Sequence, residues 1–248
     1  MYEGVLFVKR FFSYVKNAGL YFGSSLLVAI IGVLLNPIFA MNLSHEDYAI
    51  IGYYTSFNVF LIPLLHCCLI SYYSRQYFFI SEKERTKLEN TILSSIILIG
   101  SIVLGLFLMG FYLIHKMTKI DFPFFPFALL AFLQLYISNI TTFYTTKLRI
   151  SRKAKRFALV TVSQCLITSL GALLLVVCYK YGATGKLLGT LIGSIIIAIY
   201  SYNHSGISFS IDRKILSKAL EFCWPLILSA VLWYFLTGVD RMFLVRLN

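Results

Sequence analysis

The sequence predicts an all-α fold: a polytopic bundle of transmembrane helices with six membrane spans and a seventh. Hydrophobic residues make up 59% of the 248 residues and charged residues only 13%, whereas a soluble domain carries about 25% charged residues. Apolar stretches of about 20 residues recur along the chain, and this length matches a hydrocarbon core about 30 Å thick. The short connections between them are alternately poor and rich in lysine and arginine. These observations exclude an ordinary soluble domain.

The chain begins with a segment, residues 1–17, in which Lys9, Arg10 and Lys16 lie among apolar side chains. This mixture indicates a cytoplasmic or interfacial segment that leads into the membrane. The first span follows at residues 18–41. Because it is too long for a signal peptide and no small-residue cleavage motif closes it, we expect it to remain as a transmembrane helix.

The other spans show the same long apolar stretches bounded by polar residues. We expect them at residues 48–73, 91–114, 124–146, 157–179 and 186–202, with the seventh at 222–248. Residues 18–202 then form a six-helix lobe. The five cysteines lie in or beside these spans without metal-binding spacing, so we interpret them as small apolar fillers: Cys67, Cys68, Cys165, Cys178 and Cys223.

Residues 203–221 are predicted to form a cytoplasmic linker that contains an amphipathic helix. Four aliphatic residues recur there at helical spacing, with three basic residues between them: Ile211, Ile215, Leu216 and Leu220, and Arg213, Lys214 and Lys218. Such a helix suits the inner membrane surface. Pro225 lies near the start of the next span, where its missing N–H costs least.

The distribution of lysine and arginine predicts the topology. Of the 22 such residues, 16 lie in the N-terminal segment and in the second, fourth and sixth connections, and six lie on the other side. The positive-inside rule therefore places the N-terminus in the cytoplasm. The net charge of +12 reflects this topology and anionic headgroups rather than nucleic acid, because no nucleic-acid-binding motif accompanies it.

Polar side chains within the spans are candidate functional residues, because each needs a partner or water inside the hydrocarbon. They include Asn36 in the first span; Thr55, Asn58 and His66 in the second; Gln134, Ser138, Thr141, Thr142 and Thr145 in the fourth; and Thr161, Gln164 and Thr168 in the fifth. They either form hydrogen bonds between helices or line a hydrated cavity for a polar substrate.

Two further patterns lie in the sixth and seventh spans. Gly185, Gly189 and Gly193 are spaced by four, which predicts close packing between helices. Asp240 and Arg241 are adjacent opposite charges that either pair with each other or contact a substrate. The chain contains no phosphate-binding loop, no zinc-protease or serine-hydrolase motif, and no paired carboxylates within a span. We therefore expect no cofactor and no enzymatic activity.

Three stretches resemble the Wzx-like polysaccharide flippase family, within the superfamily that includes the MATE drug exporters and lipid II flippases. Residues 35–54 resemble the end of its first helix and the turn into the second. Residues 147–197 have its basic loop, span and glycine-containing turn in the same order. Residues 213–244 resemble its amphipathic helix, the proline-containing start of its seventh helix and the Asp-Arg pair near that helix's end.

The resemblance implies a MATE-like transporter with two lobes and a central cavity. This chain would supply the first lobe and the start of the second, so we expect it to be an N-terminal half. The implied function is translocation of undecaprenyl-pyrophosphate-linked oligosaccharide across the bacterial inner membrane for O-antigen, lipopolysaccharide, capsule or exopolysaccharide synthesis. The implied partners are membrane lipids, the polysaccharide-assembly machinery and the second half.

Such a substrate needs polar groups for its sugars and cations for its pyrophosphate. The residues expected to line the cavity are Asn36, Asn58, His66, Gln134, Thr142 and Gln164, and those expected at the phosphates are Arg10, Arg75 and Arg241, with Asp240 beside them. His66 and Asp240 are also titratable and could couple transport to an ion gradient.

Three rival functions remain open. A MATE-type drug or cation exporter would favour acidic residues in the cavity, and this chain has few. A membrane-embedded oligosaccharide polymerase or ligase would carry a large outer loop with catalytic residues, whereas the outer loops here are short. A remnant that does not transport is the third alternative.

Overall fold

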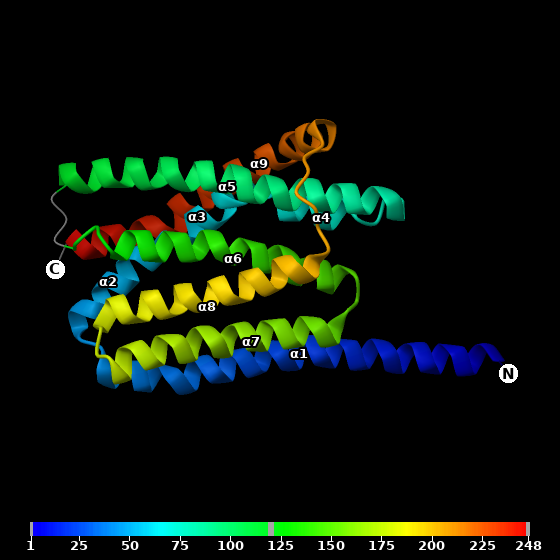
Figure 1. Ribbon diagram of the computed structural model, residues 1–248, viewed down its shortest axis with the longest axis horizontal. Coiled ribbons are helices and arrows are strands. Elements are labelled where there is room, and N and C mark those ends of the chain that lie inside the picture. The colour runs from blue at the N-terminus through cyan, green and yellow to red at the C-terminus, as the bar shows by residue number, and fades with distance from the viewer. Residues whose placement is uncertain (1, 119–121, 247–248) are drawn as a thin grey trace.

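The computed structural model describes residues 2–118 and 122–246, with side chains described for residues 15–117, 122–234 and 236. Every regular element in these ranges is a helix, as the sequence predicts. In order they are α1 (Tyr2–Asn42), α2 (His45–Ser56), α3 (Asn58–Leu65), α4 (Leu69–Gln76), α5 (Glu82–Thr118), α6 (Phe127–Ile150), α7 (Ala154–Leu173), the π-helix η1 (Leu174–Cys178), α8 (Gly182–Ser205) and α9 (Arg213–Arg246). Figure 1 shows the long helices running side by side.

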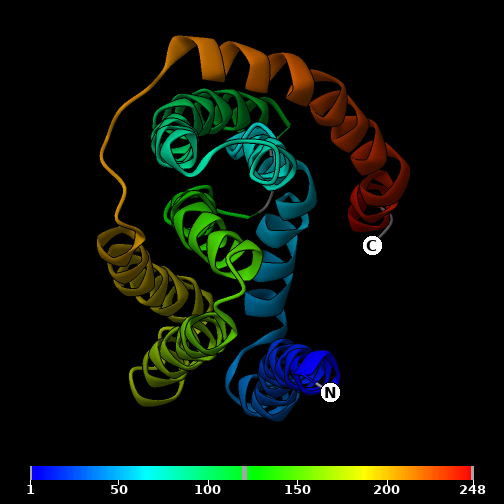
Figure 2. The ribbon, with the colours of Figure 1, turned by 90° about the vertical axis from the view of Figure 1, so that its right-hand side faces the viewer.

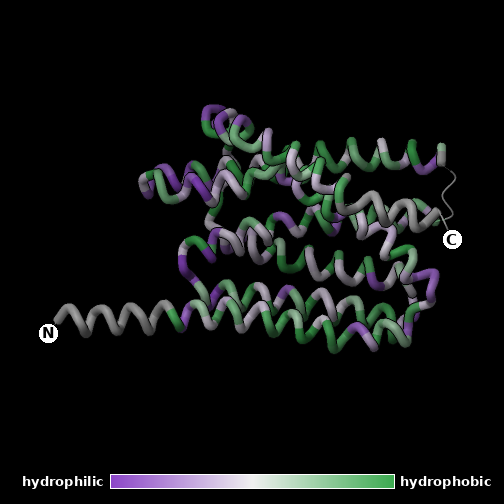
Figure 3. Tube along the Cα trace, turned by 180° about the vertical axis from the view of Figure 1, so that it is seen from behind, coloured by the Kyte–Doolittle hydropathy of each residue, from purple (hydrophilic) through white to green (hydrophobic). Residues whose placement is uncertain are grey.

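Seven helical stretches among the described residues are long and apolar enough to cross a membrane, which confirms the polytopic bundle. They are Val15–Asn42, His45–Leu65, Glu82–Met117, Phe127–Ile150, Ala154–Cys178, Gly182–Ser205 and Arg213–Tyr234. Hydrophobic residues run along the helices, and hydrophilic residues gather at the turns and where α5 and α9 begin (Figure 3). Many large apolar side chains face outward, among them Leu106 and Met109 on α5. This surface suits contact with lipid.

The beginnings of α5 and α9 and the α6–α7 turn lie at one end of the bundle, where α1 extends toward the N-terminus (Figure 1). We call it the basic end, because it carries the lysines and arginines of residues 75–87, 147–156 and 213–218. The turns between α1 and α2 and between η1 and α8 lie at the opposite end.

The predicted close packing along the sixth span is confirmed. Helix α8 packs against both α6 and α7, and α7 packs against α1. A Cβ at Gly193 would lie 2.7 Å from Cα of Thr168, and one at Gly189 would collide with the backbone of Ala172. The glycines therefore allow the backbones of α7 and α8 to approach where larger residues would separate them.

The second span is not one helix, which corrects the prediction for residues 48–73. It is divided into α2, α3 and α4, with breaks at Phe57 and at residues 66–68. Pro63 lacks an N–H group, and both Cys67 (φ 46°) and Cys68 (φ 53°) adopt the left-handed conformation. Turn hydrogen bonds satisfy the freed groups, since the N–H of Cys68 donates to the carbonyl of Pro63 over 3.2 Å.

Two of the segment boundaries expected from the sequence fall inside continuous helices. Helix α1 is continuous from Tyr2 through residue 17 into the membrane span. Helix α9 is continuous through Pro225, so the amphipathic linker helix and the seventh span form one helix. It packs against α4, α5 and α3 and arches over α5 toward α3 (Figure 2).

Residues 206–212 connect α8 to α9 and lie along α5 (Figure 2). Three side chains of α5 accept hydrogen bonds from the linker backbone: Asn90 from Ser208 N, Ser94 from Ser210 N and Thr91 from Asp212 N, at 3.1–3.2 Å. Asp212 then caps α9, because its Oδ1 accepts from Lys214 N over 2.9 Å. The start of α9 is therefore fixed by polar contacts with α5.

Candidate functional site

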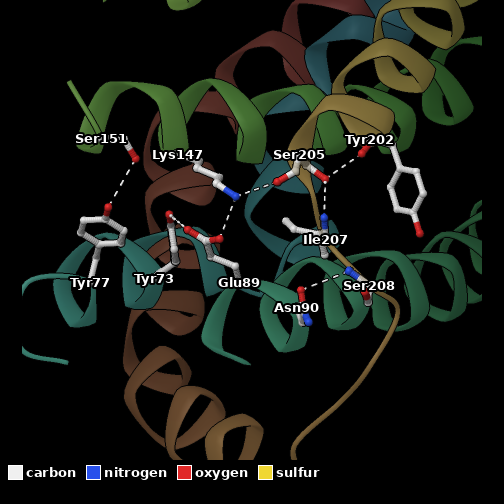
Figure 4. Close-up of polar contacts among 10 residues, drawn as sticks. All are labelled: Tyr73, Tyr77, Glu89, Asn90, Lys147, Ser151, Tyr202, Ser205, Ile207 and Ser208. Carbon is white, nitrogen blue, oxygen red and sulfur yellow. Dashed lines mark hydrogen bonds and ion pairs between the residues drawn. The ribbon is translucent and has the colours of Figure 1, made fainter. Parts of the chain in front are cut away.

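A buried polar network joins the helices at the basic end (Figure 4). The Nζ of Lys147 on α6 lies 2.7 Å from Oε2 of Glu89 on α5, and these side chains are only 19% and 11% exposed. Lys147 also donates to the carbonyl oxygen of Ser205 over 2.7 Å, and the hydroxyl of Tyr73 donates to Oε1 of Glu89 over 3.0 Å. Four helices, α4, α5, α6 and α8, are thereby connected through one ion pair.

The contacts of this network connect helices to one another, so we interpret the network as structural. Buried charges are stable only when paired and hydrogen-bonded, and both charges here are. The sequence prediction missed the network, because it placed both residues in separate loops. Lys147 was interpreted only through its role in topology. A partner for it could not be identified among the acidic residues of other segments without the fold.

A hollow of about 350 Å³ lies beside the network, between α4 and α9. We call it the Arg75 cleft; its lining residues are Tyr72, Arg75, Gln76, Phe79 and Phe222. The guanidinium carbon of Arg75 lies 4.9 Å from the centroid of the Phe222 ring, and the Tyr72 ring lies 5.7 Å from the same ring. Arg75 is exposed and forms no ion pair with any described residue. It is therefore a cation available to an anionic ligand.

The predicted cavity residues are dispersed in the structure. Gln134 is partly buried, and its Nε2 donates to Oγ of Ser194 over 3.2 Å, so it joins α6 to α8. The hydroxyl of Thr142 donates to the carbonyl of Ser138 on its own helix. Asn36 is exposed on α1, and Asn58 and Gln164 are partly buried on α3 and α7. Neither hollow described here is lined by these residues.

His66 occupies the break between α3 and α4. Its Nδ1 is shielded from solvent and has no hydrogen-bond partner among the described residues. Gly100 of α5 packs against this break, because a Cβ there would lie 2.7 Å from the carbonyl oxygen of Leu65. The other three predicted site residues, Arg10, Asp240 and Arg241, have side chains outside the described residues.

A second polar junction lies at the opposite end of the bundle. Asp47 completes a capping box with Ser44 at the start of α2, and its Oδ1 accepts a hydrogen bond of 2.6 Å from Ala183 N on α8. Gly182 has a φ of 55°, and a Cβ there would lie 2.5 Å from the same oxygen. Lys186 lies beside this junction, with its Nζ 4.8 Å from the Phe39 ring centroid. Two of the stretches that carry the family resemblance therefore meet here.

A comparison with protein families gives one finding that bears on function. The model of a family described as polysaccharide biosynthesis protein matches residues 14–248. This range contains all three stretches singled out in the sequence. Neither a curated protein nor a solved structure gives a significant match.

Proposed function

Because the chain belongs to the polysaccharide biosynthesis protein family, we propose that it translocates an undecaprenyl-pyrophosphate-linked oligosaccharide across the bacterial inner membrane. The route is from the inner to the outer leaflet, for O-antigen, capsule or exopolysaccharide assembly. The chain acts as a transporter rather than an enzyme, with its N-terminus in the cytoplasm. The seven apolar helices and the basic end support this orientation.

The observation that carries the proposal is the chemistry of the Arg75 cleft. A guanidinium binds phosphate oxygens through a planar fork of donors. Aromatic rings such as those of Phe79 and Phe222 offer apolar faces to a sugar ring or to the first isoprene units. Arginine and aromatic rings therefore match the junction of a lipid-linked sugar, where a charged pyrophosphate lies between two less polar parts.

The position of the cleft also supports the proposal. It lies at the basic end, on the side where a substrate made in the cytoplasm would arrive. One of its walls is α4, the last segment of the interrupted second span, and discontinuous helices are typical of transporter binding sites. The opposite wall is α9, which runs over this face of the bundle (Figure 2).

Two acidic residues whose contacts the structure describes, Glu89 and Asp47, favour an anionic substrate over the cation of a drug exporter. A cation exporter needs a carboxylate that is free to bind its substrate. Glu89 is instead paired with Lys147, and Asp47 accepts hydrogen bonds from Ser44 and Ala183. Neither carboxylate is available without dismantling a helix junction.

The proposal is tested in cells from which the gene is deleted. We expect lipid-linked oligosaccharide to accumulate with its sugar on the inner leaflet, where a membrane-impermeant lectin added to spheroplasts cannot reach it. Reintroduction of the intact gene should clear it. Accumulation on the outer leaflet would instead indicate a polymerase or ligase, and normal surface polysaccharide without accumulation would show that the proposal is wrong.

A further inference from the structure

A second basic hollow lies on the other side of the bundle from the Arg75 cleft, where the α6–α7 turn meets α1. It measures about 400 Å³ and is lined by Asn17, Arg152, Lys153, Ala154, Lys155 and Arg156. We call it the α1–α7 hollow. Figure 1 shows the turn beside α1, at the level where α1 leaves the bundle. Four cationic side chains thus surround one concave surface.

The turn that holds these cations is tightly constrained. Only three residues separate α6 from α7, and Arg152 adopts a φ of 57°. The N–H of Arg152 donates to the carbonyl of Arg149, and that of Lys153 donates to the carbonyl of Leu148. The cations therefore project from an ordered backbone, and the basic cluster has a defined shape.

Aromatic contacts fix the turn against α1. The rings of Tyr21 on α1 and Phe157 on α7 meet edge to face, with centroids 5.1 Å apart. The guanidinium of Arg149 lies 5.0 Å from the Phe157 ring. In each helix the aromatic residue follows the residues that line the hollow: Tyr21 comes one turn after Asn17, and Phe157 comes directly after Arg156. The contact between the two rings therefore holds the two walls of the hollow together.

Three of the cations that line the α1–α7 hollow carry charges that no described carboxylate neutralises. Lys153, Lys155 and Arg156 are exposed and form no ion pair among the residues whose side chains are described. Lys147, one turn before this cluster in α6, is by contrast neutralised by Glu89. Like charges this close repel one another, so an anion bound between them would be stabilised by all of them.

The position of the hollow relative to the apolar stretch of α1 indicates what binds there. Asn17 is the last residue before the long apolar stretch of α1, so the hollow opens where headgroups meet hydrocarbon. We propose that the α1–α7 hollow binds the phosphate headgroup of an anionic phospholipid of this leaflet. The acyl chains would lie along the apolar surface of α1, where Phe22 and Leu26 are exposed. This site is separate from the Arg75 cleft and does not depend on the proposed transport function.

The test measures binding of fluorescent phosphatidylglycerol to the full 248-residue chain in a neutral detergent. The double variant K153Q/K155Q should bind it about thirtyfold more weakly, because each of the two lysines near a lipid phosphate contributes about 1 kcal/mol. The matched control is K83Q/K87Q, which removes two exposed lysines from the same end and should bind as the unmodified protein does. K153R/K155R keeps the charge and should retain binding.

Three results would overturn the proposal. Equal weakening in K153Q/K155Q and K83Q/K87Q would show a diffuse attraction to the basic end. Equal binding of fluorescent phosphatidylcholine would show that the headgroup charge is not recognised. Displacement of the probe by inorganic phosphate at concentrations that match the lipid would assign the hollow to a free anion. Circular dichroism of each variant verifies that helicity is unchanged.

Discussion

Lys147 Nζ lies 2.7 Å from Glu89 Oε2, and this contact joins two helices whose paired residues are 58 positions apart. Around it, Tyr73 and the Ser205 carbonyl complete the coordination of both charges. The pair also bears on the linker to α9. Lys147 bonds to the last residue of α8, Ser205, and the linker begins directly after it.

Replacing Lys147 with methionine should destabilise the protein, because Glu89 would lose its ion-pair partner and keep only the hydrogen bond from Tyr73. Breaking a fully buried pair costs about 3–5 kcal/mol, and the partial exposure of this one reduces the expected loss to about 2 kcal/mol. Thermal unfolding in detergent measures the effect, with K87M as an exposed control on α5. The double variant K147M/E89Q should lose less than the sum of the two single variants. Strict additivity would contradict a direct interaction.

Gly193→Leu should separate α7 from α8, because even a Cβ would lie 2.7 Å from Thr168 Cα. Overpacking of this kind costs about 1–3 kcal/mol or more, and a backbone collision is at the upper end. The matched control is Gly105→Leu, since no atom lies within 4 Å of a Cβ at Gly105. Equal melting temperatures for the two variants would refute the packing role of the glycine series.

Asp47→Ala should loosen the opposite end of the bundle, since it removes the acceptor of the Ser44 N–H in the capping box of α2 and the acceptor of the Ala183 N–H. Each of these hydrogen bonds contributes about 1 kcal/mol, so the expected total is about 2 kcal/mol. Hydrogen exchange at the start of α8 should accelerate. Glu46→Ala, at the neighbouring exposed position, serves as the control and should leave exchange there unchanged.

Arg75→Gln should reduce transport of lipid-linked oligosaccharide by about tenfold or more, because a charge-assisted contact to phosphate contributes about 1.5–3 kcal/mol. Arg75→Lys should retain intermediate activity, since it keeps the charge and loses the planar fork. Unfolding temperatures should stay within about 1 °C of the unmodified protein, as expected for an exposed residue. Full activity of Arg75→Gln would remove the Arg75 cleft from the substrate path.

The helical bundle follows from hydropathy, because each span must satisfy its backbone internally and bury apolar side chains in lipid. The spacing of Gly185, Gly189 and Gly193 likewise predicts a local contact, and the charge of Arg75 beside a span makes it a candidate for contact with phosphate. The break at Cys67 and Cys68 was missed, because neither residue type favours the left-handed conformation that both adopt. The Glu89–Lys147 pair was missed because only the tertiary fold brings its members together.

Gln134 illustrates how far the candidate site could be predicted from the sequence. A polar residue in a span can face a cavity or a neighbouring helix, and the choice depends on the rotation of the helix about its axis. The structure orients Gln134 toward Ser194 and leaves Thr142 exposed two turns later. Periodicity alone places residues on a common face and does not specify what that face meets.

The hydrogen bonds from α5 to the linker at residues 206–212 anchor the start of the last helix. Asp212 N donates to Thr91 on α5, and Asp212 Oδ1 accepts from Lys214 N in the first turn of α9. Because α9 also packs against α3 and α4, a displacement of its first turn would have to be accommodated by these two segments of the interrupted second span.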